Sequence, residues 1–216
     1  MGNQPPFRQC DSATRPIVAF DFDGTLTVSD SFTAFLRWRA RPLGHALGMV
    51  RLAPAAAAWL GHRDRGRIKA AAVREFLIGE SREALEAQAE AFMEAVWPRF
   101  MRPDALACWE DWGRRGAWRV IVTASPETTV APFARRLGAE ALLGTPLAFD
   151  ADHRVTGAFD GANCRGDEKV RRLRDAYGDD VKLVAAYGDT SGDREMLEIA
   201  ETPGYRVFTG QPGGKA

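Results

Sequence analysis

Three short runs of apolar and β-branched residues stand out along the chain, and each of them ends in a cluster of polar residues. They span 17–23 (IVAFDFD), 118–125 (WRVIVTAS) and 181–189 (VKLVAAYGD). Continuous apolar runs of this length, each followed by a helix-like segment, are typical of parallel strands that are buried on both faces. The pattern predicts an α/β fold with a doubly wound parallel sheet, in which functional residues lie at the carboxyl ends of the strands.

The first two predicted strands are separated by about 100 residues, far more than the roughly 30 residues of a β-α-β unit. Within this interval the segments 31–41, 66–78 and 81–97 carry apolar residues at helical spacing, and Pro98 and Pro103 are expected to end the last helix. We therefore predict a helical insert over residues 31–102, and an α/β core formed by 17–30 and 103–216. A helix over 104–115, closed by Gly116, should lead back into the core.

The remaining parts of the chain, and its composition, exclude several classes of protein. Residues 1–16 are polar and are predicted to form a flexible leader. The apolar stretch 42–61 is interrupted by His45, Arg51 and Pro54, which favours a buried or interfacial helix over a membrane span.

The 29 basic residues balance 29 acidic ones, which weighs against nucleic-acid binding. Three cysteines without a CxxC pair predict neither a disulfide framework nor a zinc site, as is typical of the cytoplasm.

Two carboxylates follow the first predicted strand in the sequence DFDGT, at Asp21 and Asp23. Like charges this close destabilise each other unless a cation lies between them or one of them is protonated. The pair therefore predicts a metal ion, a shared proton, or both. A solvated Asp-Gly turn is the alternative, which the apolar residues before Asp21 disfavour.

A second acidic pair follows the third predicted strand in the sequence GDTSGD, at Asp189 and Asp193. Helix capping by Ser191 or Thr190 would account for Asp193 in the first turn of the next helix, but it would not account for Asp189. Because Asp189 lies at the same sheet edge as Asp21, the two pairs together offer the hard oxygen ligands that Mg²⁺ prefers.

Weaker signals come from a hydroxyl cluster and a lysine. Thr123, Ala124 and Ser125 follow the second strand, where a hydroxyl and free backbone N–H groups can receive phosphate oxygens, although Ser before Pro is also an ordinary helix beginning. Lys169 stands before a predicted helix, and a lone lysine is most often solvated. These residues matter only in combination with the aspartates.

In combination, DFDGT, Thr123, Lys169 and GDTSGD resemble the four ordered motifs of the haloacid dehalogenase superfamily of phosphohydrolases. The helical insert after the first motif resembles the type 1 cap of the phosphoserine-phosphatase-like branch, subfamily IB. Within that branch the chain looks most like the bacterial subgroup that includes C-type phosphatidylglycerophosphate phosphatases and cell-division-linked relatives.

The resemblance implies a role for each motif residue in the hydrolysis of a phosphomonoester. Asp21 would be the nucleophile that forms an aspartyl-phosphate, and Asp23 would be the general acid and base. The cofactor would be Mg²⁺, held by Asp21, the backbone carbonyl of Asp23 and Asp189, with Asp193 supporting its water shell. The phosphoryl oxygens would be bound by Thr123, the backbone at Ala124, and Lys169.

The substrate is predicted from the insert. Phosphoserine phosphatases typically have a Glu nine positions after the nucleophile, where this chain has Asp30. The insert also carries Trp38, Trp59 and Trp97 beside a basic cluster that includes Arg63, Arg65, Arg67 and Lys69. An apolar, basic insert could meet a lipid phosphate such as phosphatidylglycerophosphate at a membrane surface, as a peripheral protein of the cytoplasm. Core tryptophans beside a solvated basic loop are the equally weighted alternative.

Other functions remain open at this point. The main alternative is a phosphatase of phosphoserine or of another small metabolite. A phosphorylatable signalling receiver, a phosphoryl-transfer mutase and a catalytically idle binding module are further alternatives. The Asp-x-Asp spacing and the large insert disfavour the receiver, and the presence of every motif residue disfavours the idle module.

Overall fold

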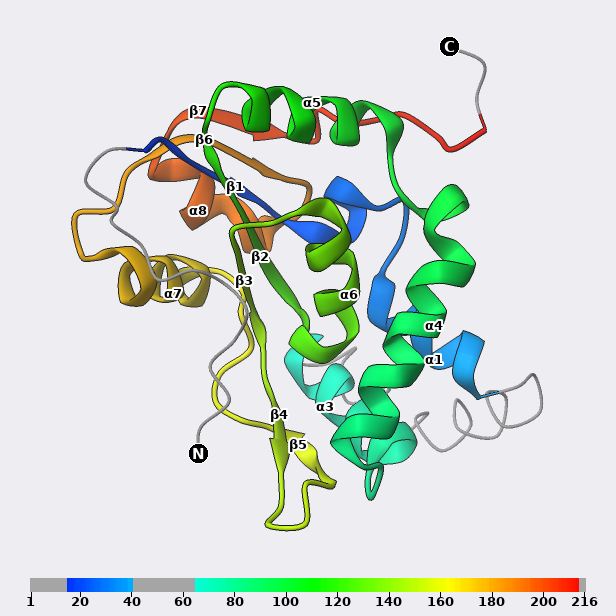
Figure 1. Ribbon diagram of the computed structural model, residues 1–216. Coiled ribbons are helices and arrows are strands. Elements are labelled where there is room, and N and C mark those ends of the chain that lie inside the picture. Colours follow the sequence, from blue (N-terminus) through cyan, green and yellow to red (C-terminus); the bar gives the residue numbers. More distant parts are fainter. Residues whose placement is uncertain (1–14, 41–64, 214–216) are drawn as a thin grey trace.

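The computed structural model describes residues 15–40 and 65–213, and it has a five-stranded parallel sheet at its centre (Figure 1). The strand order is β3-β2-β1-β6-β7, and every neighbouring pair is parallel. The strands are β1 (Ile17–Phe20), β2 (Trp118–Pro126), β3 (Ala141–Thr145), β6 (Leu183–Gly188) and β7 (Ala200–Tyr205). The three strands predicted from the sequence are thus the three central ones, and the doubly wound α/β fold is confirmed.

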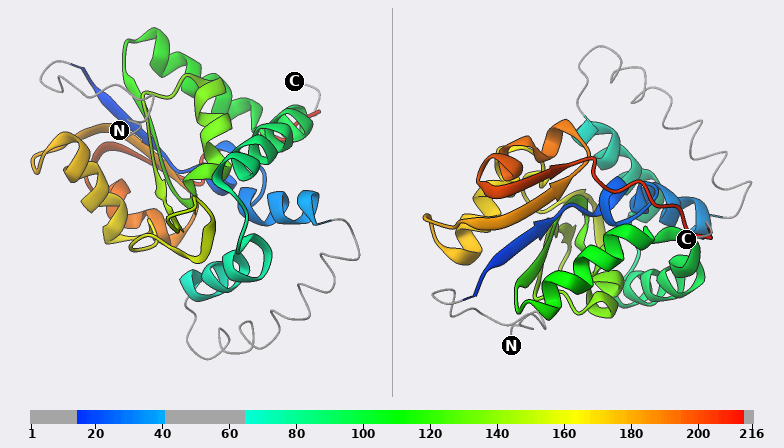
Figure 2. Two further views of the ribbon diagram at one scale, coloured as in Figure 1. Left: turned by 60° about the horizontal axis from the view of Figure 1, so that its bottom comes forward. Right: turned by 90° about the horizontal axis from the view of Figure 1, so that it is seen from above.

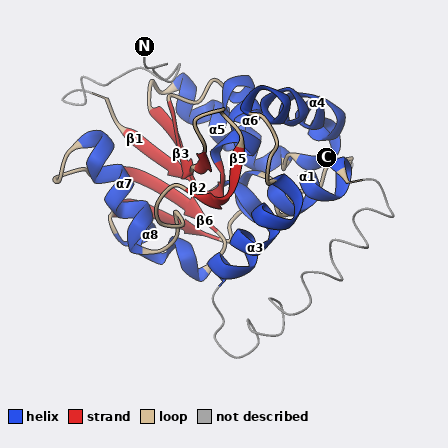
Figure 3. Ribbon diagram, turned by 90° about the horizontal axis from the view of Figure 1, so that it is seen from below, coloured by secondary structure: helices blue, strands red, loops and turns tan. Residues whose placement is uncertain are grey.

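Helices cover both faces of the sheet, so that β1 is buried on each side (Figure 3). Val18 and Phe20 point into one core, which α5 (Pro103–Arg114) and α6 (Glu127–Leu137) complete. Ile17 and Ala19 point into a second core beneath α7 (Asp167–Tyr177) and α8 (Arg194–Glu198). Burial on both faces explains why the run is apolar throughout instead of alternating.

The interval between β1 and β2 holds the helices α1 (Ser31–Arg39), α3 (Arg65–Leu77) and α4 (Arg82–Phe100), which lie beyond the carboxyl end of the sheet (Figure 2). Helix α4 packs on α6, where the ring of Trp97 stacks on Phe133 at 6.0 Å between centroids. The two ends of this helical segment meet, because Thr27 and Met101 form an antiparallel bridge. The three helices were predicted from the sequence, and their grouping with residues 31–102 as a separate domain stays a prediction.

A small hairpin of β4 (Leu147–Phe149) and β5 (Val155–Phe159) packs against α3. The turn between α3 and α4 pairs with β5, since Gly79 donates to the carbonyl of Val155 at 2.8 Å and Val155 donates back to Glu80 at 2.9 Å. The hairpin therefore connects the sheet side of the molecule to the helix that carries Lys69.

Three sequence predictions need correction. Strand β1 ends at Phe20, three residues earlier than the predicted run, and Phe22–Leu26 form a turn with non-helical φ/ψ angles at Asp23 and Gly24, so Asp21 and Asp23 lie beyond the strand. Helix α4 runs through Pro98 to Phe100. A proline near a helix end removes only one hydrogen bond, and burial of Phe100 against Phe92 favours continuation of the helix. The third strand begins at Leu183, two residues later than predicted.

Two predictions fall outside the described residues: most of the leader over 1–16, and the interfacial helix over 42–61. Pro16 is described, and its carbonyl accepts a hydrogen bond from the Trp118 amide at 2.8 Å. Across residues 15–40 and 65–213, no helix is both long and apolar enough to cross a bilayer.

Candidate active site

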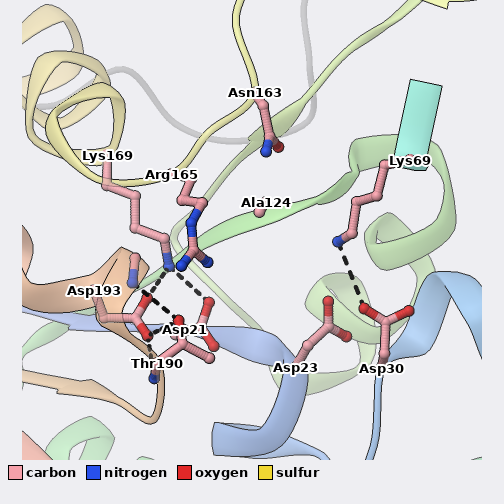
Figure 4. Close-up of a pocket in the computed structure, with 11 residues that line it drawn as sticks. Asp21, Asp23, Asp30, Lys69, Ala124, Asn163, Arg165, Lys169, Thr190 and Asp193 are labelled. Carbon is pink, nitrogen blue, oxygen red and sulfur yellow. Dashed lines mark hydrogen bonds and ion pairs between the residues drawn. The ribbon is translucent and has the colours of Figure 1, made fainter. Parts of the chain in front are cut away.

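A pocket of about 110 Å³ lies at the carboxyl end of the central strands (Figure 4). Residues that the sequence singled out supply much of its lining: Asp21, Asp23, Asp30, Ala124, Lys169 and Asp193. The lining thus comes together from five separate parts of the chain, at residues 21–30, 69, 124, 163–169 and 190–193. The polar ends of the three predicted strands do meet at one edge of the sheet.

Asp21 is positioned by the end of β1 and by the turn that follows it. Its amide still pairs with the carbonyl of Tyr187 on β6 at 2.8 Å, which fixes the backbone to the sheet. Its carboxylate is buried, and Oδ1 accepts a hydrogen bond from the Lys169 ammonium at 2.6 Å while Oδ2 accepts one from the Thr25 hydroxyl at 3.3 Å. Asp21 is therefore held in one orientation facing the pocket.

Lys169 is the centre of a buried charged cluster, which corrects the expectation that a lone lysine is solvated. Its ammonium donates three hydrogen bonds, each of 2.6 Å, to Asp21, to Asp193 and to the backbone carbonyl of Val122. An ammonium has three donors and no acceptor, so every proton of Lys169 has a partner. Helix α7 thus carries this side chain to the backbone of β2 at Val122.

The loop after β6 holds Asp189 and Asp193 through a capping box. The hydroxyl of Thr190 accepts from the Gly192 amide, and Oδ2 of Asp193 accepts from the Thr190 amide at 2.8 Å. The predicted capping is thus present, with Thr190 as the capping residue. Asp193 has a second role as well, because its other oxygen pairs with Lys169.

The acidic residues fit a divalent cation. One oxygen from each of Asp21, Asp189 and Asp193 lies within 4.8 Å of the others. Oδ1 of Asp189 is buried and has no hydrogen-bond partner among the described residues, whereas both oxygens of Asp193 accept hydrogen bonds. An unpartnered buried carboxylate oxygen is costly unless an ion or water satisfies it. Hard oxygen ligands beside a pocket with room for water suit Mg²⁺.

Gly24 makes this arrangement possible. Its φ of +83° favours glycine, and a Cβ at this position would lie 2.4 Å from Oδ2 of Asp189. Any other residue would clash with the Asp189 carboxylate and force a shift there. The glycine of DFDGT is therefore required both for the turn and for the approach of the two carboxylates.

The charges in the cluster shift one another's pKa values. The pKa of Asp21 is raised to about 7, because burial and the charges of Asp193 and Asp23 raise it more than the charge of Lys169 and its hydrogen bond lower it. Burial and then the charge of Asp193 also raise the pKa of Asp189. Burial alone would lower the pKa of Lys169, but Asp21 and Asp193 raise it above the ordinary value. A single lysine does not neutralise these aspartates, so a cation near Asp21 and Asp189 would relieve the cost.

Asp23 lies on the other side of the pocket and contacts the helical insert. Oδ1 accepts from the amide of Ser31 at the start of α1 at 2.7 Å, and Oδ2 accepts from the hydroxyl of Ser125 on β2. Burial and the charge of Asp30 raise the pKa of Asp23, although Lys69 and the two hydrogen bonds lower it in part. The carboxyl group is thus aimed at the pocket by groups from both the sheet and the insert.

The predicted phosphate-binding residues are placed unequally. Ala124 lines the pocket, whereas Thr123 is fully buried and its hydroxyl accepts from the Ser125 amide at 3.1 Å. The structure brings Thr123 next to the pocket without placing it in the lining. Its role in phosphate binding stays a prediction.

Asp30 has a structural role that was not predicted, as the N-cap of α1. It accepts from the Thr33 amide at 2.7 Å and pairs with Lys69 at 3.5 Å. Burial alone would raise the pKa of Asp30, but Lys69 and Thr33 lower it. Arg63, the side chains of Arg65 and Arg67, and Trp59 lie outside the described residues. Of the other tryptophans, Trp97 packs in the core, whereas Trp38 is 42% exposed.

Three further residues line the pocket: Lys69, which the sequence placed only in the basic cluster of the insert, and Asn163 and Arg165, to which it assigned no role. Lys69 reaches it from α3, and Asn163 and Arg165 reach it from the loop before α7 (Figure 4). The rarity of lysine in this chain singles out Lys69, and the proximity of Arg165 to Lys169 along the chain is the only signal for the loop residues.

Comparison with known proteins supports the resemblance at the level of the haloacid dehalogenase superfamily. Residues 18–198 match the haloacid dehalogenase-like hydrolase family. Protein CicA of Caulobacter vibrioides is 58% identical over 196 residues, which are 91% of this chain and 88% of that protein.

Two solved structures share the fold. One is a Bordetella pertussis Tohama I protein of unknown function, with a TM-score of 0.72 and 25% identity over 88% of this chain and 89% of its own. The other is a phospho-aspartyl intermediate analogue of phosphoserine phosphatase, with a TM-score of 0.59 and 18% identity over 88% and 85%. With the family match over most of its length, the chain belongs to the haloacid dehalogenase-like hydrolase family and is an enzyme of the hydrolase class.

Proposed function

We propose that this hydrolase is a Mg²⁺-dependent phosphomonoesterase that works through an aspartyl-phosphate on Asp21. The observation that carries the proposal is the buried Asp21 carboxylate at the end of β1, paired at 2.6 Å with Lys169 and close to Asp189. Lys169 can lessen the repulsion between this carboxylate and an anionic phosphate. Membership of a hydrolase family favours this function over the signalling receiver.

The proposed reaction has two steps. In the first, a carboxylate oxygen of Asp21 attacks phosphorus, the bond from phosphorus to the alcohol oxygen breaks, and Asp23 gives its proton to the departing alcohol. In the second, water attacks phosphorus, Asp23 takes the proton from that water, and the bond to Asp21 breaks to release inorganic phosphate. Lys169, Thr123 and the backbone at Ala124 would bind the phosphoryl oxygens in both steps.

The ion would be held by Asp21, Asp189 and the backbone carbonyl of Asp23. Asp193 would support its water shell, which agrees with the hydrogen bonds that already occupy both of its oxygens. Bound there, Mg²⁺ supplies positive charge for the phosphoryl oxygens and lowers the repulsion among the aspartates.

For the substrate we propose a lipid phosphate such as phosphatidylglycerophosphate, reached by peripheral contact with a membrane from the cytoplasm. Phosphoserine is the alternative. Asp30 stands where phosphoserine phosphatases typically have a Glu that meets the amine of the substrate. Its carboxylate already pairs with Lys69 and caps α1, so it is poorly available to a substrate amine. The exposed ring of Trp38 on α1 supports an apolar contact.

The test of the reaction is release of inorganic phosphate from phosphoserine, glycerol 3-phosphate, p-nitrophenyl phosphate and phosphatidylglycerophosphate with Mg²⁺. We expect turnover that is lost with EDTA and restored by Mg²⁺. Undiminished turnover in EDTA would contradict the metal dependence, and failure to release phosphate from any ester would contradict the function. Faster hydrolysis of phosphoserine than of the lipid would overturn the lipid assignment.

A triple substitution tests whether the basic cluster contributes to hydrolysis of the lipid phosphate more than to hydrolysis of small esters. Replacing Arg63, Arg65 and Arg67 together by Gln should slow hydrolysis of the lipid phosphate more than that of p-nitrophenyl phosphate, because only the lipid needs contacts beyond the phosphoryl group. Added salt should act in the same direction by screening exposed charges over about 8 to 10 Å. Equal losses on both substrates would contradict a role in lipid contact.

A further inference from the structure

A chain of two hydrogen bonds connects helix α3 of the insert to the proposed general acid. Lys69 on α3 donates to the hydroxyl of Ser125 on β2 at 3.3 Å, and that hydroxyl donates to Oδ2 of Asp23. Ser125 is fully buried. In Figure 4, Lys69, Asp30 and Asp23 lie on one side of the pocket, and Lys169 lies on the opposite side.

The direction of this chain is fixed by chemistry. An ammonium group can only donate, so the Ser125 oxygen must be the acceptor in its bond with Lys69. A hydroxyl has one proton, and with its oxygen engaged by Lys69 that proton is free to point at Asp23. The Ser125 backbone is itself anchored, because its amide donates to the Thr123 hydroxyl at 3.1 Å. Lys69 therefore sets the orientation of the Ser125 hydroxyl on a rigid strand.

The other partners of these groups complete the restraint. Oδ1 of Asp23 is held by the Ser31 amide at 2.7 Å, so both carboxyl oxygens have a fixed donor. Lys69 is held by Asp30 at 3.5 Å, and Asp30 is fixed as the cap of α1. Of Asp23, Ser31, Lys69 and Asp30, only Asp23 takes part in the proposed chemical steps.

We propose that Lys69 and Ser125 are positioning residues for the reaction, and that Lys69 acts through Ser125 to aim the Asp23 carboxyl group at the leaving oxygen of the substrate. The inference rests on the proposed function, because it needs Asp23 to protonate the departing alcohol. It assigns to a helix of the insert a direct effect on the proton-transfer step.

Leaving groups of different acidity distinguish this role from a structural one. An alkyl alcohol must be protonated as it departs, whereas p-nitrophenol is acidic enough to depart as the anion. A misplaced Asp23 should therefore slow hydrolysis of ethyl phosphate more than that of p-nitrophenyl phosphate. A loss of folded protein lowers both rates equally and leaves their ratio unchanged.

The experiment measures kcat/KM for both esters in wild type, Lys69→Met, Ser125→Ala and the double variant, with Mg²⁺ present. We expect Ser125→Ala to lower the ratio of ethyl to p-nitrophenyl rates about tenfold, a part of the 10² to 10⁴ that proton transfer typically contributes. Lys69→Met should lower the ratio in the same direction by a smaller factor. The double variant should match Ser125→Ala, because Lys69 has no effect once the hydroxyl is absent. Lys182→Met, at an exposed lysine before β6, is the control and should leave the ratio and both rates unchanged.

Each other result overturns the inference. Equal losses on the two esters would show that Lys69 and Ser125 support structure or phosphate binding only. Multiplicative losses in the double variant would show that Lys69 does not act through Ser125. A wild-type enzyme that hydrolyses neither ester would overturn the proposed function itself, and that result is separable because it needs no variant.

Discussion

The two ends of the pocket are built differently. At the inner end, Lys169 pairs with Asp21 at 2.6 Å, and the two side chains are 2% and 9% exposed. At the outer end, Lys69 pairs with Asp30 at 3.5 Å, and the two side chains are 20% and 39% exposed. Charges that are close and dry interact strongly, whereas charges that are farther apart and partly hydrated interact weakly. The inner pair should therefore contribute much more to the stability of the fold than the outer pair.

The difference follows from which elements supply the residues. The inner residues come from strand ends and from a helix that packs on the sheet, so the main core holds them. The outer residues come from the insert: Asp30 caps α1, which contacts α4, α6 and β2, and Lys69 lies on α3, which packs on β5. The main core therefore holds the inner end of the pocket, and the packing of the insert holds the outer end.

The largest expected effect is at Asp21. Asp21→Asn should abolish phosphate release while the fold is kept, because the amide has nearly the same shape but is not a nucleophile. Activity and circular dichroism are the measurements. Activity above roughly a hundredth of wild type, equivalent to about 2.7 kcal/mol in the barrier, would place the nucleophile elsewhere.

Lys169→Met should destabilise the protein strongly as well as inactivate it. Removal of one member of a buried ion pair typically costs about 3 to 5 kcal/mol, and here it leaves Asp21 and Asp193 facing each other without a cation. Urea unfolding in EDTA gives the free energy of unfolding. The matched change Lys69→Met at the outer end should cost about 1 kcal/mol or less. Equal costs at the two lysines would contradict the contrast between the two ends.

Gly24→Ala should weaken Mg²⁺ binding about tenfold. This is the lower end of the loss in metal affinity that is typical when the groups around a metal ligand are disturbed. The reason is the 2.4 Å approach of the new Cβ to Oδ2 of Asp189. Gly79→Ala is the control for backbone strain, since Gly79 has a similar φ of +79° and nothing within 4 Å of its Cβ position. Titration of Mg²⁺ by calorimetry measures the affinity. The same loss in both variants would mean that strain, and not the clash, is responsible.

The smallest effect is expected at Asp30. Asp30→Asn keeps a side-chain oxygen to cap α1 and removes the charge, so stability should change little and the pairing with Lys69 should be lost. Asp30→Ala also removes the cap and should cost about 1 kcal/mol. Thermal unfolding of both variants separates capping from charge. Identical unfolding free energies for the two would show that the cap bond to Thr33 contributes nothing.

The central strands could be predicted from the sequence because burial on both faces leaves an uninterrupted apolar run. Strand β7 could not, since it is an edge strand that contains Pro203 and Gly204 and is largely exposed. The strands of the β4–β5 hairpin are three and five residues long, too short for a clear pattern.

The candidate site divides in the same way. Asp21, Asp189 and Asp193 follow strands or their loops, so the pattern of the sheet places them together. Lys69 could not be placed, because its position depends on how α3 packs on the unpredicted hairpin. The burial of Lys169 depends on three acceptors that come from three different segments of the chain. A local sequence pattern cannot predict contacts between such distant segments.

The bridge between Thr27 and Met101 bears on how the protein folds. Strands β1 and β2 are neighbours, with Ile17 beside Trp118, although about 100 residues of chain separate them. Joining the ends of a flexible loop of that length costs about 3 kcal/mol more than joining a loop of about three residues. Helical contacts within the insert form between residues closer in sequence, and they bring Thr27 and Met101 together. We therefore expect the insert to fold before β1 and β2 pair, so that its helices determine how fast the sheet assembles.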